Sequence, residues 1–473
     1  MAPLFFFPVM MLSISIFSIS ALPHSLNHQH QQQLLLQFKD AISHNHTSLL
    51  DWNPHRPLCN WSGVTCDLSS HSVIALNLSH MNLDGTISSV IGNLSSLRSL
   101  DLSNNALTGH IPPQLGQLFR LEKLWLYRNQ LQGTIPTFFS ACRSLYDLEL
   151  SHNQLRGSVP PELSRLTRLK YLYLGGNNLT GTIPHSLGNL SALAELYLGD
   201  SDLTGTIPQI LGNLSALVIL ELDNSHLTGT IPRELGKLTH LQVLLLFKNN
   251  LSGTIPTSLG NLSKLRDLEL SYNELTGTIP RELGMLTHLQ VLYLWKNNLS
   301  GTIPTSLGNL SKLSELELQE NNLIGTIPRE LGMLTHLQII YLYKNNLSGT
   351  IPSSLENLSK MRELDLSENG LIGPIPPELG MLTQLKLLHL FKNYLTGTIP
   401  SSLGNLLKLR QLAFSENQLS GKIPDSLGSL HQLRRLYLRH NKLTGEIPVS
   451  LEGCWMLERL HLSYNKLWGR IPR

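Results

Sequence analysis

The chain repeats a unit of 24 residues, and this period constrains its fold more than any other feature. The stretch "NNLSGTIPTSLGNLSKL" from Asn249 to Leu265 recurs unchanged from Asn297 to Leu313. Aligned on one position that is usually asparagine, the chain gives 17 units from Val73 without insertion, the last with 17 of its 24 residues. A length of 473 residues would suggest about three domains, but a repeat array grows by adding units.

The unit reads LxxLxLxxNxLxGxIPxxLGxLxx, and we number its positions 1 to 24 from the first leucine. "LxxLxL" alternates like a short strand with one buried face, and "NxLxG" turns the chain. "IP" fixes an extended stretch, because proline restricts itself and its predecessor, and "LGxL" returns the chain across the back. One unit cannot bury its leucines alone, so stacked neighbours must share a continuous core.

Position 9 carries asparagine in 14 of the 17 units. The amide side chain has both donors and an acceptor, so a column of asparagines at one depth can satisfy turn backbone groups that water does not reach. The exceptions are Met81, Ser201 and Ser225. We expect an asparagine ladder with a weak point at the two serines.

The motifs resemble those of a known family. "GxIPxxLG", as in "TGTIPRELG" from Thr276, is similar to the plant-specific type of leucine-rich repeat, and "CNWSGVTC", with Trp61 and Gly63 in place, resembles the amino-terminal cap of plant leucine-rich repeat receptor kinases and receptor-like proteins. The resemblance covers Gln31 to Arg473. It implies an α/β leucine-rich repeat solenoid, a right-handed superhelix with a parallel concave β-sheet. It also implies secretion to the apoplast or the cell surface, and recognition of peptides or partner ectodomains.

The amino terminus predicts secretion. The first twenty residues contain no charged side chain, and their apolar run ends in small residues near Ser20 and Ala21. This is typical of a secretory signal, although no Lys or Arg precedes the run; an uncleaved membrane anchor is the alternative. We therefore expect a signal peptide over residues 1–21, a cap with a disulfide over 22–72 and the repeat array over 73–473.

The chain stops in mid-unit at "LSYNKLWGRIPR". Terminal units normally need a polar cap, and the leucines of the last units would face an open end. We expect either a piece of a longer receptor or a truncated protein with a partner at that end.

The four cysteines fall into two classes. Cys59 and Cys66 are close in sequence and can pair in a secreted chain. Cys142 and Cys454 both occupy position 22, where other units carry leucine, and they are 13 units apart. At about 4.8 Å per stacked strand that is roughly 60 Å, too far for a disulfide. We expect two buried thiols.

Composition and motifs exclude several classes of function. Charged residues are 15% of the chain, the formal net charge is +3, and no basic block favours nucleic acid. No kinase signature, HExxH, GxSxG or metal-type cysteine spacing occurs. We expect no catalytic site, no metal site and no cofactor.

Positions 5, 7 and 8 should point out of the concave sheet. They hold 13 of the 22 aromatic residues from Val73 onward, and exposed aromatic rows usually mark contacts. Lysines recur every 48 residues beside these rings, and the units between them carry Glu221, Asp223, Glu269, Glu317, Glu320, Asp365, Glu368 and Glu416. The candidate ligand-binding residues are Tyr173, Tyr197, Phe247, Lys248, Tyr293, Trp295, Lys296, Tyr341, Tyr343, Lys344, Phe391 and Lys392. Tandem duplication of a two-unit block explains the 48-residue period, so a scaffold with inherited aromatics is the alternative.

Thirteen N-x-S/T sequons favour a secreted glycoprotein. They lie at Asn45, Asn60, Asn77, Asn93, Asn178, Asn189, Asn213, Asn250, Asn261, Asn298, Asn309, Asn346 and Asn357. None after the first unit falls on a concave strand position, so N-linked glycans would leave that face bare.

We therefore predict a secreted or cell-surface recognition module, without catalysis, that binds a peptide or protein ligand on its concave face. It would be the ectodomain of a plant receptor kinase in signalling or defence, or a part of one. A co-receptor ectodomain or kinase partner would carry the signal. The alternatives are a soluble defence protein similar to polygalacturonase inhibitors and a non-signalling structural protein of the cell wall.

Overall fold

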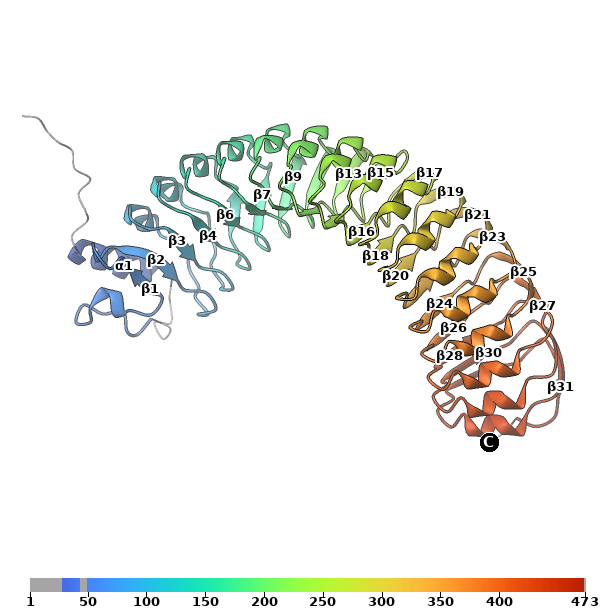
Figure 1. The fold of residues 1–473 in the computed structure, drawn as a ribbon. Coiled ribbons are helices and arrows are strands. Elements are labelled where there is room, and N and C mark those ends of the chain that lie inside the picture. The colour runs from blue at the N-terminus through green and yellow to red at the C-terminus, as the bar shows by residue number, and fades with distance from the viewer. Residues whose placement is uncertain (1–27, 43–48, 472–473) are drawn as a thin grey trace, which may run out of the picture.

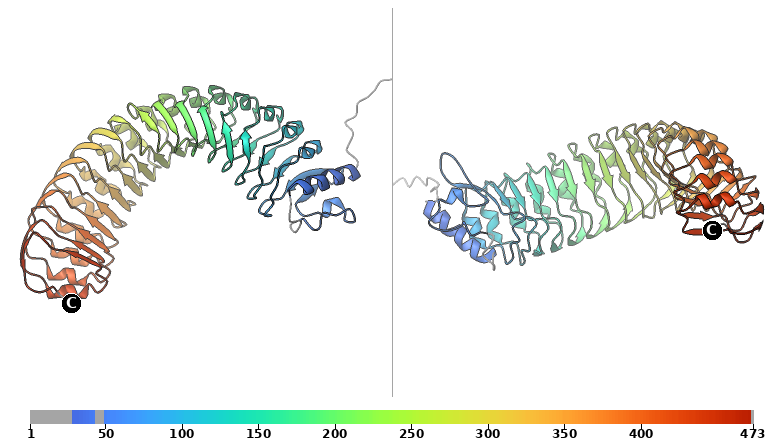
Figure 2. Two further views of the ribbon diagram at one scale, coloured as in Figure 1. Left: turned by 180° about the vertical axis from the view of Figure 1, so that it is seen from behind. Right: turned by 90° about the horizontal axis from the view of Figure 1, so that it is seen from below.

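The computed structural model describes residues 28–42 and 49–471. The predicted signal peptide and the sequon at Asn45 lie outside these residues. The repeats stack into an arc, with strands along its inner side, helical turns along its outer side and the helix α1 at one end (Figure 1). The arc is also twisted out of its plane (Figure 2). The chain is a leucine-rich repeat solenoid of the predicted type.

A sheet of 18 strands forms the concave face. Apart from the antiparallel β1, its strands are parallel, and each residue pairs with the one 24 positions later, as Leu292 does with Leu316. The strands are β1 (Val64–Cys66), β2 (Val73–Asn77), β3 (Ser99–Asp101), β4 (Lys123–Trp125), β6 (Asp147–Glu149), β8 (Tyr171–Tyr173), β10 (Glu195–Tyr197), β12 (Ile219–Glu221), β14 (Val243–Leu245), β16 (Asp267–Glu269), β18 (Val291–Tyr293), β20 (Glu315–Glu317), β22 (Ile339–Tyr341), β24 (Glu363–Asp365), β26 (Leu387–His389), β28 (Gln411–Ala413), β30 (Arg435–Tyr437) and β32 (Arg459–His461).

A second set of parallel strands follows the asparagine position, where the sequence predicted only a turn. The turn itself is made at position 8, which has a positive φ in every unit from His80 to Tyr464. Positions 10 to 14 then extend and pair in three sheets. The strands are β5 (Gln132–Thr134), β7 (Gln154–Gly157), β9 (Asn178–Thr182), β11 (Asp202–Thr206), β13 (His226–Thr230) and β15 (Asn250–Ser252); β17 (Thr276–Thr278), β19 (Asn298–Thr302), β21 (Asn322–Thr326), β23 (Asn346–Gly349), β25 (Gly370–Pro374) and β27 (Tyr394–Thr396); and β29 (Ser420–Gly421), β31 (Lys442–Glu446) and β33 (Lys466–Trp468).

Short 3₁₀ helices return the chain across the convex side. The glycine of "LGxL" lets neighbouring coils approach: a Cβ at Gly284 would lie 2.3 Å from the carbonyl oxygen of Ser306. The helices are η1 (Leu58–Asn60), which lies in the cap, and then η2 (Ser89–Asn93), η3 (Pro113–Gln117), η4 (Thr137–Ala141), η5 (Pro161–Arg165), η6 (His185–Asn189), η7 (Gln209–Asn213), η8 (Arg233–Lys237), η9 (Thr257–Asn261), η10 (Arg281–Met285), η11 (Thr305–Asn309), η12 (Arg329–Met333), η13 (Ser353–Asn357), η14 (Pro377–Met381), η15 (Ser401–Asn405), η16 (Asp425–Ser429) and η17 (Val449–Gly453).

One hydrophobic core runs through the described part of the chain, because the leucines of each unit pack on those of the next. Cys142 and Cys454 are buried, unpaired thiols within it, as predicted. Their sulfur atoms lie 3.5 Å from the carbonyl oxygen of Leu115 and 3.2 Å from that of Leu427.

The helix α1 (His28–Ile42) covers the first coil and buries Leu35 and Phe38. The predicted disulfide joins Cys59 and Cys66, with Cα atoms 5.6 Å apart. It lies beside Trp61, whose ring stacks on that of Trp52 with centroids 5.3 Å apart. Within residues 28–42 and 49–471, no helix combines the length and apolar character needed to cross a membrane.

Candidate ligand-binding face

The predicted aromatic residues lie on the concave strands or two residues beyond them, but they are half-buried rather than fully exposed. This applies to all eight aromatics of the candidate set: Tyr173, Tyr197, Phe247, Tyr293, Trp295, Tyr341, Tyr343 and Phe391. Adjacent strands are about 4.8 Å apart, so each ring lies against the side chains of the neighbouring unit. The ring of Trp295, for example, meets that of Tyr272 edge-on, with centroids 5.8 Å apart. The rows are therefore a preformed surface of packed rings.

Three of the five tyrosines at position 5 are fixed by glutamates at position 3 of the next unit. The hydroxyl of Tyr173 donates to Oε2 of Glu195 at 2.7 Å, and Tyr293 and Tyr341 donate in the same way to Glu315 and Glu363. Burial and these acceptors raise the pKa of all three phenols. Alternation of aromatic and acidic units thus has a structural role, because the ring of one unit uses an acceptor in the next.

The repeated lysines also contact the face itself. Nζ of Lys344 lies 3.7 Å from Glu320, and that of Lys392 lies 3.1 Å from Glu368. Nζ of Lys296 lies 3.8 Å from the centroid of the Tyr272 ring, a cation–π contact. In each case the partner occupies position 8 of the preceding unit. Lys344 and Lys392 thus pair with acidic side chains of the preceding unit, and Lys296 with a tyrosine ring. The sequence analysis did not predict these contacts.

A hollow of about 270 Å³ opens on the concave face where β6, β8, β10 and β12 end. The rings of Tyr173 and Tyr197, with centroids 4.7 Å apart, line it together with four carboxylates. The lining residues are Glu149, Ser151, His152, Tyr173, Gly175, Gly176, Tyr197, Gly199, Asp200, Glu221 and Asp223. We call this the acidic hollow.

Two carboxylates of the acidic hollow, those of Glu221 and Asp223, have raised pKa values, because their surroundings disfavour the ionised form. Burial, with the charges of Asp223, Glu195 and Asp200 nearby, raises the pKa of Glu221 from 4.5 to about 7. Burial likewise raises the pKa of Asp223 to about 6, against the opposing charge of Lys248. Both groups favour a positive partner, because a nearby cation stabilises the ionised form.

A second hollow of about 290 Å³ lies near the carboxyl end of the array, and we call it the aromatic hollow. It exists because Ala413 replaces a larger side chain at position 5. Among the described residues, buried Oγ of Ser415 and Nε2 of His389 have no hydrogen-bond partner. Nδ1 of His389 lies 3.0 Å from Asp365. The lining residues are His389, Phe391, Ala413, Ser415, Tyr437, Arg439 and His461.

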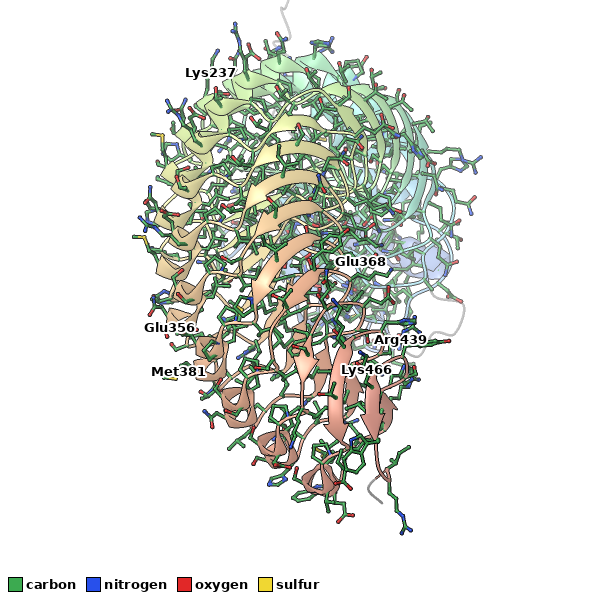
Figure 3. All side chains as sticks on the ribbon, turned by 90° about the vertical axis from the view of Figure 1, so that its right-hand side faces the viewer. Lys237, Glu356, Glu368, Met381, Arg439 and Lys466 are labelled. Carbon is green, nitrogen blue, oxygen red and sulfur yellow. A yellow bond between two sulfur atoms is a disulfide. The ribbon has the colours of Figure 1, made fainter. Side chains whose placement is uncertain are left out.

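The charged residues of the concave strands' ends lie away from the convex flank. Figure 3 shows Glu368 and Arg439 apart from Lys237, Glu356 and Met381, which follow the column of 3₁₀ helices. Nη2 of Arg439, at the rim of the aromatic hollow, lies 3.2 Å from Oε1 of Glu416.

A larger hollow, of about 900 Å³, lies away from the concave face, beside the "IP" segments of four successive units around Pro328 and Pro352. Smaller hollows of about 560 and 620 Å³ repeat beside the same segments of earlier units, around Pro208 and Pro232. This groove follows from the geometry of every unit, so it does not single out one site.

Of the predicted residues, Tyr173 and Tyr197 line one hollow and Phe391 lines the other, but the sequence analysis did not predict either hollow. It searched for enriched side chains, whereas the hollows arise where side chains are missing. The sequence does show where side chains are missing: Gly175 and Gly199 stand at position 7, and Ala413 stands at position 5, where other units carry larger residues.

The described sequon asparagines are all exposed. Those at position 10 begin strands of the second sheets, as Asn298 begins β19, and those at position 21 end 3₁₀ helices, as Asn309 ends η11. Asn77, on β2, is the one described sequon asparagine at a concave strand position.

Family models for leucine-rich repeats match most of the array. A leucine-rich repeat region model matches residues 138–277 and 256–371, and two further repeat models match 96–118, 120–142 and 383–443. A leucine rich repeat N-terminal domain model matches 28–67. The structure resembles the crystal structure of a TDR receptor, with a TM-score of 0.81 and 36% sequence identity, over 83% of this chain and 68% of that one.

The chain belongs to the plant leucine-rich repeat family. The plant peptide hormone receptor RGFR1, solved in complex with RGF2, is 36% identical to this leucine-rich repeat chain with a TM-score of 0.78, over 86% of this chain and 72% of that one. The Arabidopsis receptor kinase HAESA, solved with the peptide hormone IDA and the co-receptor SERK1, is 33% identical with a TM-score of 0.62, over 93% and 87%.

Curated relatives match this leucine-rich repeat chain over shorter stretches. The LRR receptor-like serine/threonine-protein kinase EFR of Arabidopsis thaliana is 50% identical over 68 residues, which are 14% of this chain and 7% of that protein. The LRR receptor-like serine/threonine-protein kinase SIK1 of Oryza sativa subsp. japonica is 44% identical over 64 residues, 14% and 6%. The chain thus matches less than a tenth of the length of either kinase.

Proposed function

We propose that the chain is a cell-surface or apoplastic recognition module that binds an extended peptide or a protein segment on its concave face, without catalysis of its own. The observation that carries this proposal is the concentration of 13 of 22 array aromatics on that face, where two hollows of about 270 and 290 Å³ open. Clustered aromatics in preformed surfaces are typical of binding hot spots.

Relatives support the same proposal. RGFR1 is described with RGF2, and HAESA with a peptide hormone and a co-receptor. We propose a peptide ligand for this chain as well, and a co-receptor ectodomain or kinase partner that carries the signal. N-linked glycans at the exposed sequons would cover the other faces. The proposed contact area extends from Tyr173 to Phe391, with Trp295 and Tyr343 near its centre.

Peptide capture tests this function. The secreted, glycosylated chain would be immobilised and exposed to plant extract, bound peptides identified by mass spectrometry, and one of them synthesised for direct affinity measurement. The double variant Trp295→Ala with Tyr343→Ala should weaken binding at least about thirtyfold, because truncated aromatic anchors commonly cost 2 kcal/mol or more.

A matched control replaces exposed rings that lie off the concave face: Phe119→Ala with Tyr394→Ala, whose side chains are 63% and 59% exposed. This variant should bind normally. Because Trp295 and Tyr343 are half-buried, their variant would be measured well below its melting temperature. Undiminished binding by it would move the site off the concave face.

A further inference from the structure

The acidic hollow differs from the rest of the concave face by its three glycines. Position 8 has a positive φ in all units, and residues with side chains, such as His152 and Asn224, occupy it elsewhere. Backbone conformation therefore does not require Gly176. Gly175 and Gly199, at position 7, do not have a positive φ at all. What the three glycines change is the space above the sheet.

Asp223 points into this space. Its side chain is only 8% exposed, and a Cβ added at Gly199 would lie 2.6 Å from its Oδ1. No side chain of the described residues donates a hydrogen bond to this carboxylate; its own backbone N–H does. The charge of Lys248 acts on Asp223, but among the described residues no lysine, arginine or histidine forms an ion pair with it. A carboxylate buried to this degree without a paired cation is costly unless a partner arrives.

The walls fit an organic cation. Glu149, Asp200, Glu221 and Asp223 line the hollow, and among the described residues no lysine or arginine does. The same residues include no group of three acidic, histidine or cysteine side chains that could hold a metal ion. The rings of Tyr173 and Tyr197 provide π-faces, which attract ammonium and guanidinium groups. A volume of about 270 Å³ suits one side chain rather than a drug-sized ligand.

We infer that the acidic hollow binds the guanidinium group of an arginine in the peptide ligand, between the carboxylates of Glu221 and Asp223 and over the tyrosine rings. Arginine suits it better than lysine, because its planar group stacks on aromatic rings and donates to two carboxylate oxygens at once. This inference rests on the proposed function, and it specifies one residue of the ligand.

The test uses short acetylated and amidated peptides of alanine and serine with one central residue: arginine, lysine or the neutral isostere citrulline. Each is titrated against the secreted, glycosylated chain by ligand-observed NMR near neutral pH. We expect the arginine peptide to bind about tenfold or more tightly than the citrulline peptide, with lysine between them. Equal affinities, or no binding of the arginine peptide at millimolar concentration, would overturn the inference.

Variants locate the binding. Glu221→Gln with Asp223→Asn should reduce the arginine peptide to the affinity of the citrulline peptide. The control pair Glu269→Gln with Glu317→Gln changes carboxylates at position 5 of units that have no glycine hollow, and should leave the affinity unchanged. If only the control pair lost affinity for the arginine peptide, the cation would bind outside the acidic hollow.

A steric variant separates charge from space. Gly176→Asn adds a side chain to the hollow without changing its charge, and asparagine already adopts this backbone conformation at Asn104 and Asn224. The ring of His152 must shift, because the added Cβ would lie 2.5 Å from its Nδ1. It should abolish the preference for arginine. Retained preference would mean that the hollow is not the site.

The outcome is independent of the capture experiment. If a captured ligand depends on Trp295 and Tyr343 but the arginine peptide does not bind, the arginine site is wrong and the proposed function stands. If the arginine peptide binds as described but no peptide is captured, the arginine site stands and the proposed function is wrong.

Discussion

Asparagine at position 9 ties each coil to the one before it. Asn297 donates from Nδ2 to the carbonyl oxygens of Leu270 and Leu294 at 3.0 and 3.1 Å, and its Oδ1 accepts from the backbone N–H of Leu275 at 3.0 Å. The hydroxyls of Ser201 and Ser225 donate instead to the backbone carbonyl oxygens of Gly199 and Asp223, two residues away in their own coils, at 3.2 and 3.3 Å. The two serines therefore interrupt the bridge between coils.

Restoring the bridge should stabilise the array. Ser201→Asn and Ser225→Asn should each raise the free energy of unfolding by about 0.5–1.5 kcal/mol per restored hydrogen bond, measured by denaturant unfolding. Amide hydrogen exchange should slow in the same coils. The reverse change, Asn297→Ser, is the control and should lower the free energy of unfolding. If both serine replacements lower it as well, the serines have another role.

The two free thiols give a second residue-scale prediction. Burial raises the pKa of Cys142 to about 11 and also raises that of Cys454, so neither should react with a thiol reagent in the folded chain. After denaturation without reductant, two thiols should react, because Cys59 and Cys66 form the disulfide. A count of none or four would contradict the assignment.

At the scale of elements, the parallel strands could be predicted because the 24-residue period aligns every "LxxLxL" segment. The second sheets could not, since positions 10 to 14 carry no alternating apolar pattern; they pair only because the left-handed residue before them, such as Lys296 before β19, redirects the chain. The convex segments form 3₁₀ turns because five residues such as Thr305–Asn309 are too few for a regular α-helix.

The candidate site was predictable in part, because the 24-residue period fixes which face each position occupies. Register places Tyr341 on the concave face, but its half-burial and its bond to Glu363 depend on a side chain in the next unit. Hollows depend on absent side chains, which a search for enriched residues does not detect. A search for glycine or alanine at positions 5 and 7 would have pointed to Gly175, Gly199 and Ala413.

The acidic strip of β12 and β16 predicts a pH dependence. Glu221 and Glu269 have pKa values raised from 4.5 to about 7 in the folded chain. Between about pH 7 and 4.5 the folded state therefore binds more protons than the unfolded state, and the free energy of unfolding should increase as pH falls. Melting temperature measured across this range should rise on acidification.

Single variants test which carboxylate causes the pH dependence of the melting temperature. Glu221→Gln should raise the melting temperature above pH 7 and flatten its pH dependence, because the amide carries no charge to bury. Glu356→Gln, on the convex 3₁₀ helix η13, should leave the profile unchanged. A profile that Glu221→Gln does not alter would contradict the predicted source.

At the scale of the whole molecule, the faces of the curved array differ in the side chains that they carry. The sheet side carries packed rings and two hollows, and the sequons after the first unit lie on the second sheets and the 3₁₀ helices. Glycans are bulky and hydrophilic, so they would shield the flanks while the concave face stays open.

This separation can be tested by moving a glycan onto the concave face. Glu317→Asn with Gln319→Ser would create a sequon on β20 at positions 5 and 7, the same positions that Asn77 and Ser79 occupy in the first unit. Glu317, which would carry the glycan, pairs with Tyr293 of β18 and Tyr341 of β22, so a glycan there should abolish binding of the captured peptide. Mass spectrometry would verify that the new site is occupied.

The matched control places a new glycan on the convex flank. Lys237→Asn creates a sequon with Thr239 at the end of η8, in the position that Asn261 holds at the end of η9. This variant should be glycosylated and should bind the peptide normally, because Lys237 lies along the column of 3₁₀ helices (Figure 3). Binding that survives the glycan on β20 and is lost with the one on η8 would assign recognition to the convex side, and the aromatic rows would then serve only to pack the sheet.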